Sequence, residues 1–408
     1  MIINKIDNLT SANHHSCSRL LYLDGIRGLA ALIVVVAHFN PWPWVLNQNS
    51  ILSKIISFTH QFALGNLAVM FFFGLSAFIL SRLVFVEYNK YQNISIWKFY
   101  IRRTLRIWPL YFLSVFTAYL LYCNPEFLPP SFSGSQIVFN WIKEHYLIFL
   151  TFTSSWSLAL NGIFTHVDYS PGTLRILWSI SVEEQFYFLF PIVSLIALRF
   201  KSARPFIISS IIIISIAFRY IFINTPVDNP EMKSSGGLYY HPLNYLDLFI
   251  FASVAGWLSA LPNWRFVEFF KKNYLLYFIF PAMLCLAYWL GKVIWYPYSL
   301  ALVFIMPFLA LLISTLLLWA YYNPDACLVR FVSSKPFAIL GRISFSIYIW
   351  HIISNSCVSF VFAKFMHGIN INLYFILTII SAICFGVISY LLIEKPFLII
   401  KNSFRSIL

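Results

Sequence analysis

Charged residues are scarce in this 408-residue sequence, and their scarcity excludes a large water-soluble domain. Only 10% of the residues are Asp, Glu, Lys or Arg, whereas about a quarter of a typical soluble domain is charged. Hydrophobic residues make up 60% of the chain, and the mean hydropathy is +0.77. This share includes the aromatic residues, which make up 20% of the chain, as expected where many helix ends meet the lipid interface. The composition therefore predicts an integral membrane protein.

The cysteines are also too few and too scattered to form a framework. None of them shows CxxC or Cys/His spacing, and they stand at positions 17, 123, 285, 327, 357 and 384. We therefore expect neither a disulfide scaffold nor a metal site.

No sequence feature separates a second domain. The first twenty residues are polar and lack a short apolar core with a cleavage site, so we expect no removable signal peptide. No Gly/Ser linker or internal repeat interrupts the rest. We predict a cytoplasmic segment over 1–20, one transmembrane domain over 21–397 and a cytoplasmic tail over 398–408.

Apolar stretches long enough to cross a bilayer recur along the chain. We expect ten spans, at about 21–40, 64–84, 105–122, 176–198, 205–223, 243–261, 274–291, 298–321, 343–363 and 372–393. An eleventh stretch, 145–160, is shorter and rich in Ser and Thr. We expect it to be re-entrant or interfacial.

The net charge of +14 indicates orientation in a bilayer rather than a nucleic-acid partner. With ten spans and both termini inside, most Lys and Arg residues fall in cytoplasmic segments, as the positive-inside rule requires. An eleventh crossing at 145–160 would send Arg199, Lys201, Arg204 and all later basic loops to the other face. The sequence thus predicts an all-α bundle of about ten transmembrane helices in the cell inner membrane, with both termini cytoplasmic.

The first span carries a pair of ionisable residues in LDGIRGLAALIVVVAHF, residues 23–39. Arg27 and His38 are eleven residues apart, which is three helical turns plus roughly 20° and a rise of about 16 Å. Both side chains therefore project from one face, with Arg27 near the cytoplasmic edge and His38 near mid-membrane. Such groups normally face the protein interior or a cavity. The alternative is a packed histidine hydrogen-bonded to a neighbouring helix.

A cluster of arginines enters the third span in FYIRRTLRIWPLYF, residues 99–112. Arg103 and Arg106 are neighbours on a helix because they are three residues apart, and Arg102 precedes them. Paired guanidinium groups suit a phosphate-bearing ligand. Positive-inside anchoring would explain any one of the three, but not the whole cluster.

Two adjacent carboxylates, Glu183 and Glu184, occur in LWSISVEEQFYFLFP, residues 177–191. They point about 100° apart on a helix, so at most one can face a central cavity, where it could orient a histidine or bind a sugar hydroxyl. The alternative is a charge in the headgroup region. Trp178, in the same motif, is a further candidate contact for a substrate.

Several later residues are candidates for proton handling or substrate binding. In GRISFSIYIWH, Ser344, Tyr348 and His351 share one helix stripe, and a structural hydrogen bond is the favoured role for His351. Arg219, near the outer end of its span, either snorkels or binds an anion, and Asp247 begins the sixth span from outside. The EKPF motif, residues 394–397, is expected only to end the last helix.

These motifs together resemble the acyltransferase 3 family of membrane acyltransferases. The shared features are the opening LDGIRGLAAL with its Arg and His eleven residues apart, FFFGLSAF, RRTLRIWPLY, WSISVEEQFYFLFP, GRISFSIYIWH and EKPF. The resemblance covers about residues 20–397. It implies transfer of an acyl group, usually acetyl from cytoplasmic acetyl-CoA, to hydroxyls of envelope carbohydrate, with His38 as the essential histidine, Arg27 its partner, and Arg103 with Arg106 the paired arginines.

The chain departs from the family pattern at three places. FFFGLSAF carries Gly74 and Ala77 where the family usually has a bulky residue and then glycine. The sixth span keeps only Asp247, without the Arg and Gly often seen around the acidic position. The sequence stops after the tenth span, so we expect no C-terminal SGNH esterase-like domain.

The hypothesis is therefore acyl transfer inside the membrane. His38 acts as general base, since neutral imidazole suits that task, and a covalent acyl-histidine is a variant. The acceptor is a carbohydrate or lipid-linked glycan, such as lipopolysaccharide O-antigen, capsule or exopolysaccharide. Two alternatives stay open: the same chemistry on an intracellular, macrolide-like small molecule, and a proton- or anion-coupled transporter. Membrane lipid surrounds the protein, and its oligomeric state is not readable from sequence.

Overall fold

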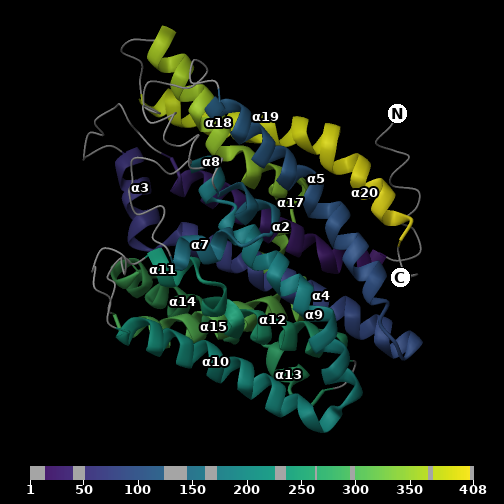
Figure 1. Cartoon of the computed structure of the whole chain (residues 1–408). Coiled ribbons are helices and arrows are strands. Elements are labelled where there is room, and N and C mark those ends of the chain that lie inside the picture. Colours follow the sequence, from purple (N-terminus) through teal and green to yellow (C-terminus); the bar gives the residue numbers. More distant parts are fainter. Residues whose placement is uncertain are drawn as a thin grey trace.

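The computed structural model describes residues 14–39, 51–123, 145–160, 172–225, 236–261, 264–294, 299–365 and 371–404, and this part of the chain consists of helices joined by turns and short irregular segments. The all-α prediction is thus confirmed (Figure 1). The longer helices are α2 (His14–Ala37), α3 (Ile51–Gln61), α4 (Leu64–Tyr91), α5 (Ile96–Cys123), α9 (Trp178–Arg199), α10 (Arg204–Asn224), α12 (Leu246–Ala260), α14 (Tyr274–Val293), α15 (Ala301–Tyr322), α18 (Ser344–Phe365) and α19 (Ile371–Ser389). The shorter ones are α7 (Ser154–Leu160), α8 (Gly172–Arg175), η3 (Lys201–Ala203), α11 (Gly236–Tyr240), η4 (Pro242–Tyr245), α13 (Val267–Phe270), α16 (Cys327–Val332), α17 (Lys335–Arg342), η5 (Tyr390–Glu394) and α20 (Lys395–Asn402).

Nine helical stretches in the described part of the chain are long and apolar enough to cross a membrane. They coincide with the second to tenth expected spans, and α2 supplies the first. Residues 145–150 and 154–160 are helical, with an interruption near Phe152, whose φ is 55°. Neither of these described segments is long enough by itself to cross a bilayer. The chain is therefore a multi-pass membrane protein.

The C-terminal end of the bundle corrects one expectation. EKPF does not end the last helix: α19 passes through the π-helical turn η5 into α20. Pro396 lies in the first turn of α20, where its missing N–H costs no hydrogen bond. Glu394 is buried and accepts a hydrogen bond from Ser346 Oγ at 2.8 Å, so this motif joins α18 to the C-terminal helices.

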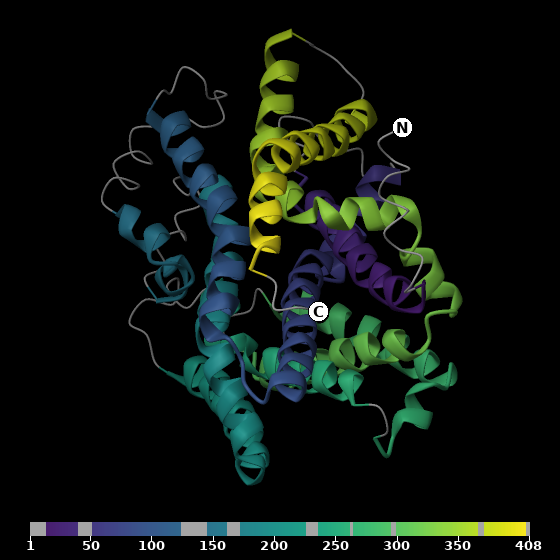
Figure 2. The same ribbon diagram turned by 90° about the vertical axis from the view of Figure 1, so that its right-hand side faces the viewer.

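Helix α2 lies within the bundle, packed against α4, α17 and α18 (Figures 1 and 2). Glycines make the contact with α17 close. A Cβ at Gly341 would overlap the carbonyl oxygen of Asp24, and a Cβ at Gly28 would overlap backbone atoms of Phe337 and Gly341. Because backbone meets backbone here, the segment of α2 that carries Arg27 has a fixed position.

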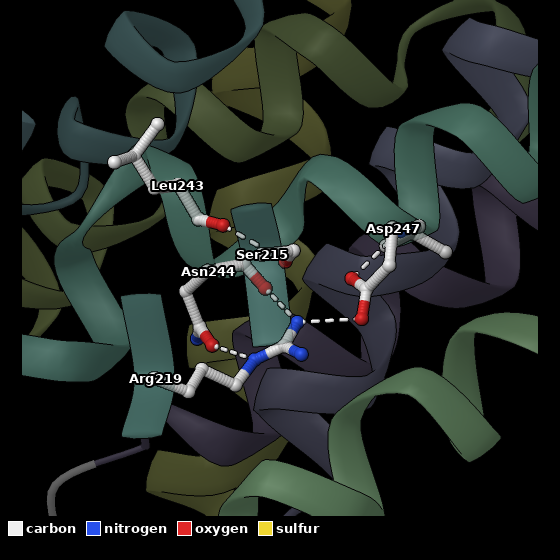
Figure 3. A network of polar contacts seen from close by, with 6 residues as sticks. Ser215, Arg219, Leu243, Asn244 and Asp247 are labelled. Carbon is white, nitrogen blue, oxygen red and sulfur yellow. Dashed lines mark hydrogen bonds and ion pairs between the residues drawn. The ribbon is translucent and has the colours of Figure 1, made fainter. Parts of the chain in front are cut away.

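A second buried contact joins α10 to η4 and α12 (Figure 3). Arg219 Nη2 lies 2.6 Å from Asp247 Oδ2, with side-chain exposures of 0% and 1%. The same guanidinium donates from Nε to Asn244 Oδ1 at 2.7 Å and from Nη2 to the Asn244 carbonyl at 2.6 Å. Leu248 N–H donates to the other carboxylate oxygen of Asp247 at 2.9 Å.

Arg219 and Asp247, expected separately as substrate contacts, thus bind each other. Both Asp247 oxygens are used within the protein, and Arg219 neither snorkels to an interface nor stands in a cavity. A buried ion pair held by further hydrogen bonds acts as a structural cross-link.

We predict that Gly341→Ala destabilises the protein. The new methyl group forces α17 away from α2, which should lower the free energy of unfolding by about 1–3 kcal/mol. The measurement is thermal unfolding of the purified protein in detergent. Gly74→Ala is the matched control, because the nearest atom to its Cβ is a side-chain methyl, Ile313 Cγ2, at 3.2 Å. Equal loss in both variants would contradict the close-packing role.

We also predict that Arg219→Met is strongly destabilising, by about 3–5 kcal/mol, because Asp247 is left buried without its cation. Adding Asp247→Leu should restore part of the stability, since the uncompensated charge is then removed. Thermal unfolding compares the single and double variants. A double variant that is stable but has lost all catalytic activity would indicate instead that Arg219 and Asp247 bind the substrate.

Candidate active site

A cavity of about 70 Å³ brings together side chains from five distant motifs. It lies between α2, α4, α5, α9 and α18. Its charged and hydrogen-bonding lining consists of Arg27, Ser76, Arg103, Arg106, Ser179, Glu183, Tyr187, Ser344 and Tyr348. We call this space the arginine cavity. Residues more than 300 positions apart in the chain, such as Arg27 and Tyr348, meet here.

Three guanidinium groups face one carboxylate in the arginine cavity. Arg27 Nη1 lies 3.8 Å from Asp24 Oδ1. The guanidinium of Arg103 lies 5.8 Å from the ring centres of Phe99 and Tyr187, and its Nε is buried without a hydrogen-bond partner in the described part of the chain. An excess of cations with an unused buried donor fits an anionic group such as phosphate.

Arg102 does not reach this cavity. Its Nη2 lies 3.6 Å from Glu87 Oε2, and its Nη1 donates to the carbonyl oxygen of Phe404 at 3.2 Å. Arg102 therefore links α5 to α4 and to the end of α20, while Arg103 and Arg106 turn inwards.

The two adjacent glutamates have different surroundings. Glu183 lines the arginine cavity and accepts a hydrogen bond from Ser76 Oγ at 2.8 Å. Glu184 is outside the lining and accepts from Trp108 Nε1 at 3.0 Å. The helical angle between them separates the two roles, as expected.

Trp178 is placed in the protein core rather than in the cavity lining. Its side chain is 4% exposed. Aromatic rings surround it, and the closest is Tyr239, with ring centres 4.7 Å apart. This position supports the start of α9 and leaves no open face for a substrate.

His38 directly follows the last residue of α2 and continues its hydrogen-bond pattern, with its N–H donating to the Val34 carbonyl at 3.0 Å. The side chain is exposed and lies outside the lining of the arginine cavity. The ring of His351, on α18, is its neighbour, with centroids 5.0 Å apart. The structure therefore places the two histidines together, apart from the arginines.

Tyr348 connects the two groups of residues. Its hydroxyl lines the arginine cavity, where it lies 2.6 Å from Ser179 Oγ and donates to the Ile176 carbonyl at 2.9 Å. Its own carbonyl oxygen accepts from His351 Nδ1 at 2.6 Å.

Some members of the site were not anticipated from sequence. Ser76 and Ser179 lie inside recognised motifs, but serines in apolar helices carry no signal of their own.

Comparisons with known proteins show the family to which this chain is similar. The family model Acyl_transf_3, an acyltransferase domain, matches residues 20–392. O-acetyltransferase OatA of Staphylococcus aureus strains NCTC 8325 and COL is 24% identical over 394 residues, which is 94% of this chain and 58% of OatA. A further S. aureus protein, SACOL0978 of strain COL, provisionally named an O-acetyltransferase, is 24% identical over 92% of this chain and 56% of its own length.

The chain thus spans less than two thirds of the length of these curated relatives. No solved structure matches it. The family match covers nearly the whole chain and includes every residue of the arginine cavity together with His38 and His351. The chain belongs to the acyltransferase 3 family, whose members are integral membrane acyltransferases.

Proposed function

We propose that this protein is a membrane O-acetyltransferase that moves an acetyl group from cytoplasmic acetyl-CoA to a hydroxyl of a cell-envelope carbohydrate. The observation that carries the proposal is the arginine cavity, whose three guanidinium groups face one carboxylate. Helix α2 connects this cavity to an accessible histidine, His38. An anion-binding site at a fixed distance from a base is what acyl transfer from CoA requires.

The arginine cavity is the proposed site for a phosphate of the donor. Its volume suits one charged group rather than a whole nucleotide, so the rest of CoA would extend towards the membrane surface. Lys90, Lys98 and Arg102 lie at the same end of α4 and α5. By the positive-inside rule this end is cytoplasmic, which is where acetyl-CoA is available.

His38 is the proposed general base. A carbonyl oxygen only accepts hydrogen bonds, so the 3.0 Å contact of His38 Nδ1 with the Val34 carbonyl places the proton of the neutral ring on Nδ1. Nε2 then carries the lone pair. It takes the proton of the acceptor hydroxyl as the oxygen attacks the thioester carbonyl, the C–S bond breaks, and the departing thiolate receives the proton from His38.

The separation of Arg27 and His38 along α2 suits a donor-binding residue and a general base. Arg27 and His38 project from one helix face with a separation of about 16 Å along the axis. A donor held by its phosphates at Arg27 would present its thioester further along the same face. The reacting carbonyl would then lie near His38, beyond the cytoplasmic half of the bundle.

The nature of the acceptor rests on the relatives. Those reported above are named O-acetyltransferases, which favours a hydroxyl acceptor. A cell-envelope glycan reached from the inner membrane is our preferred class. Acetylation of an intracellular small molecule would leave the envelope glycans unchanged, and a transporter would show solute flux without CoA release.

We predict that His38→Ala abolishes acetyl transfer. Loss of a general base lowers the rate by about 10²–10⁴-fold, while binding of acetyl-CoA should persist because His38 lies outside the arginine cavity. O-acetyl groups on envelope polysaccharide are measured by mass spectrometry and NMR in cells that carry the variant in place of the native gene. Full acetylation would refute the assignment, and a trapped acetyl group on His38 would show a two-step route.

We predict that Arg103→Gln weakens binding of acetyl-CoA about tenfold or more, because hydrogen bonds to a charged group are lost. Arg102→Gln is the matched control: this residue is adjacent in sequence but faces Glu87 and Phe404. Calorimetric titration of both purified variants with acetyl-CoA provides the comparison. Equal weakening in the two variants would argue for a general surface charge effect instead.

A further inference from the structure

A second, larger cavity lies against a different face of α9 from the arginine cavity. Its volume is about 480 Å³, within the range of about 300–1,000 Å³ that is typical of ligand sites. Helix α9 lines it with positions that recur every three or four residues from Val182 to Leu198, and α10 does the same from Arg204 to Ile214. Residues of α4 and α12 complete the wall. We call this space the apolar cavity.

The apolar cavity opens to the outside of the bundle. Leu189 and Ile214 belong to its lining, and they are 56% and 50% exposed. From Arg204 to Ile214 the lining extends about 15 Å along α10, which is half of a hydrocarbon core about 30 Å thick. An empty space at this depth would leave the wall atoms without dispersion partners. The lining and the depth fit a hydrocarbon chain of a membrane lipid.

One end of the apolar cavity is marked by Arg204, the only charged residue in the described lining. Its Nε donates to the Ala197 carbonyl at 2.6 Å and its Nη2 to the Leu198 carbonyl at 3.3 Å. These carbonyls belong to the last turn of α9, where a helix leaves such groups without internal partners. The guanidinium carbon lies 5.3 Å from the ring centre of Trp257. These contacts orient Arg204, but none of them engages Nη1 or supplies a negative charge.

The surroundings of Arg204 are positively charged. Arg199 and Lys201 are exposed and close to it in the chain, and no Asp or Glu occurs between Glu184 and Asp228. No ion pair with a carboxylate is found for Arg204 within the described ranges. By the positive-inside rule this end of the cavity is cytoplasmic. Basic residues at that surface attract anionic lipids by about 1 kcal/mol each.

The opposite end of the apolar cavity does not offer a comparable site for a headgroup. Its polar lining residues, Trp156 and Gln185, bind each other, with Trp156 Nε1 donating to Gln185 Oε1 at 2.8 Å. Gln185 Nε2 donates to the Phe152 carbonyl at 2.8 Å. Because these groups are used within the protein and carry no charge, a negatively charged headgroup belongs at the Arg204 end.

We propose that the apolar cavity binds one anionic phospholipid of the cytoplasmic leaflet, with an acyl chain between α9 and α10 and the phosphate against Arg204. Surrounding lipid is as apolar as the cavity, so the chain gains no hydrophobic free energy on entering it. The charge of the headgroup therefore determines which lipid is retained. This site does not depend on the proposed acetyl transfer. The lipid packs against the same helix that carries Glu183 and Tyr187 into the arginine cavity.

The headgroup contact is tested by native mass spectrometry of the purified full chain in detergent. The probes are palmitoyl-oleoyl phosphatidylglycerol and phosphatidylcholine with the same chains. We expect one phosphatidylglycerol to be retained in preference to phosphatidylcholine, and Arg204→Gln to weaken its binding about tenfold, because hydrogen bonds to a charged group are lost. Arg199→Gln is the matched control, since it removes the same charge from an exposed residue outside the lining, and it should have a clearly smaller effect.

The position of the acyl chain is tested by filling the cavity. Val193→Phe places a ring inside the lining, whereas Ile192→Phe places the same ring on a neighbour that is 42% exposed and outside it. We expect phosphatidylglycerol to bind the Ile192→Phe variant and raise its unfolding temperature, as in the native protein. The Val193→Phe variant should unfold cooperatively but show neither effect.

Several outcomes would overturn the inference. Equal retention of the two lipids, or equal weakening by Arg204→Gln and Arg199→Gln, would contradict the headgroup contact. Unchanged binding in Val193→Phe would place the lipid elsewhere on the surface. Displacement of phosphatidylglycerol by a lower concentration of undecaprenyl phosphate would assign the cavity to a polyprenyl carrier lipid instead of a phospholipid.

Discussion

Charge inside an apolar bundle persists only where a partner or a cavity accommodates it, and this constraint explains the placement of the main buried charges in this protein. Arg219 shows one solution: Asp247 and Asn244 bind its Nε and Nη2, so that it cross-links α10 to α12. The arginine cavity shows the other, since three guanidinium groups line it with one carboxylate, Glu183, and Asp24 balances only Arg27 from outside the lining. The same chemical group is structural where its charge is balanced and available to a ligand where it is not.

Rigid helix packing fixes the position of one of these charges, that of Arg27. Gly28 and Gly341 let the backbones of α2 and α17 meet, so the helix that carries Arg27 cannot shift without separating main chains. His38 follows the end of the same helix and keeps its hydrogen bond to Val34. The distance between anion site and base is therefore set by one rigid element rather than by the flexible reach of loops.

Sequence patterns predict the spans well and identify part of the cavity lining, because both depend on periodicity within single helices. Helical angles correctly separate Glu183 from Glu184. They do not reveal that Arg219 pairs with Asp247, since each residue alone resembles a binding group and only the fold brings them together. For the same reason the sequence alone groups Arg102 with Arg103, although Arg102 pairs with Glu87. It also places Glu394 in a motif expected to end the last helix, although Glu394 accepts a hydrogen bond from Ser346.

Tyr348 connects the arginine cavity to the two histidines. Its side chain lines the cavity, and its hydroxyl contacts Ser179 Oγ and the Ile176 carbonyl. Its own carbonyl oxygen accepts from His351 Nδ1, and the ring of His351 lies against that of His38. Because one residue of α18 makes all of these contacts, a shift of this helix would change the cavity wall and the orientation of His351 together.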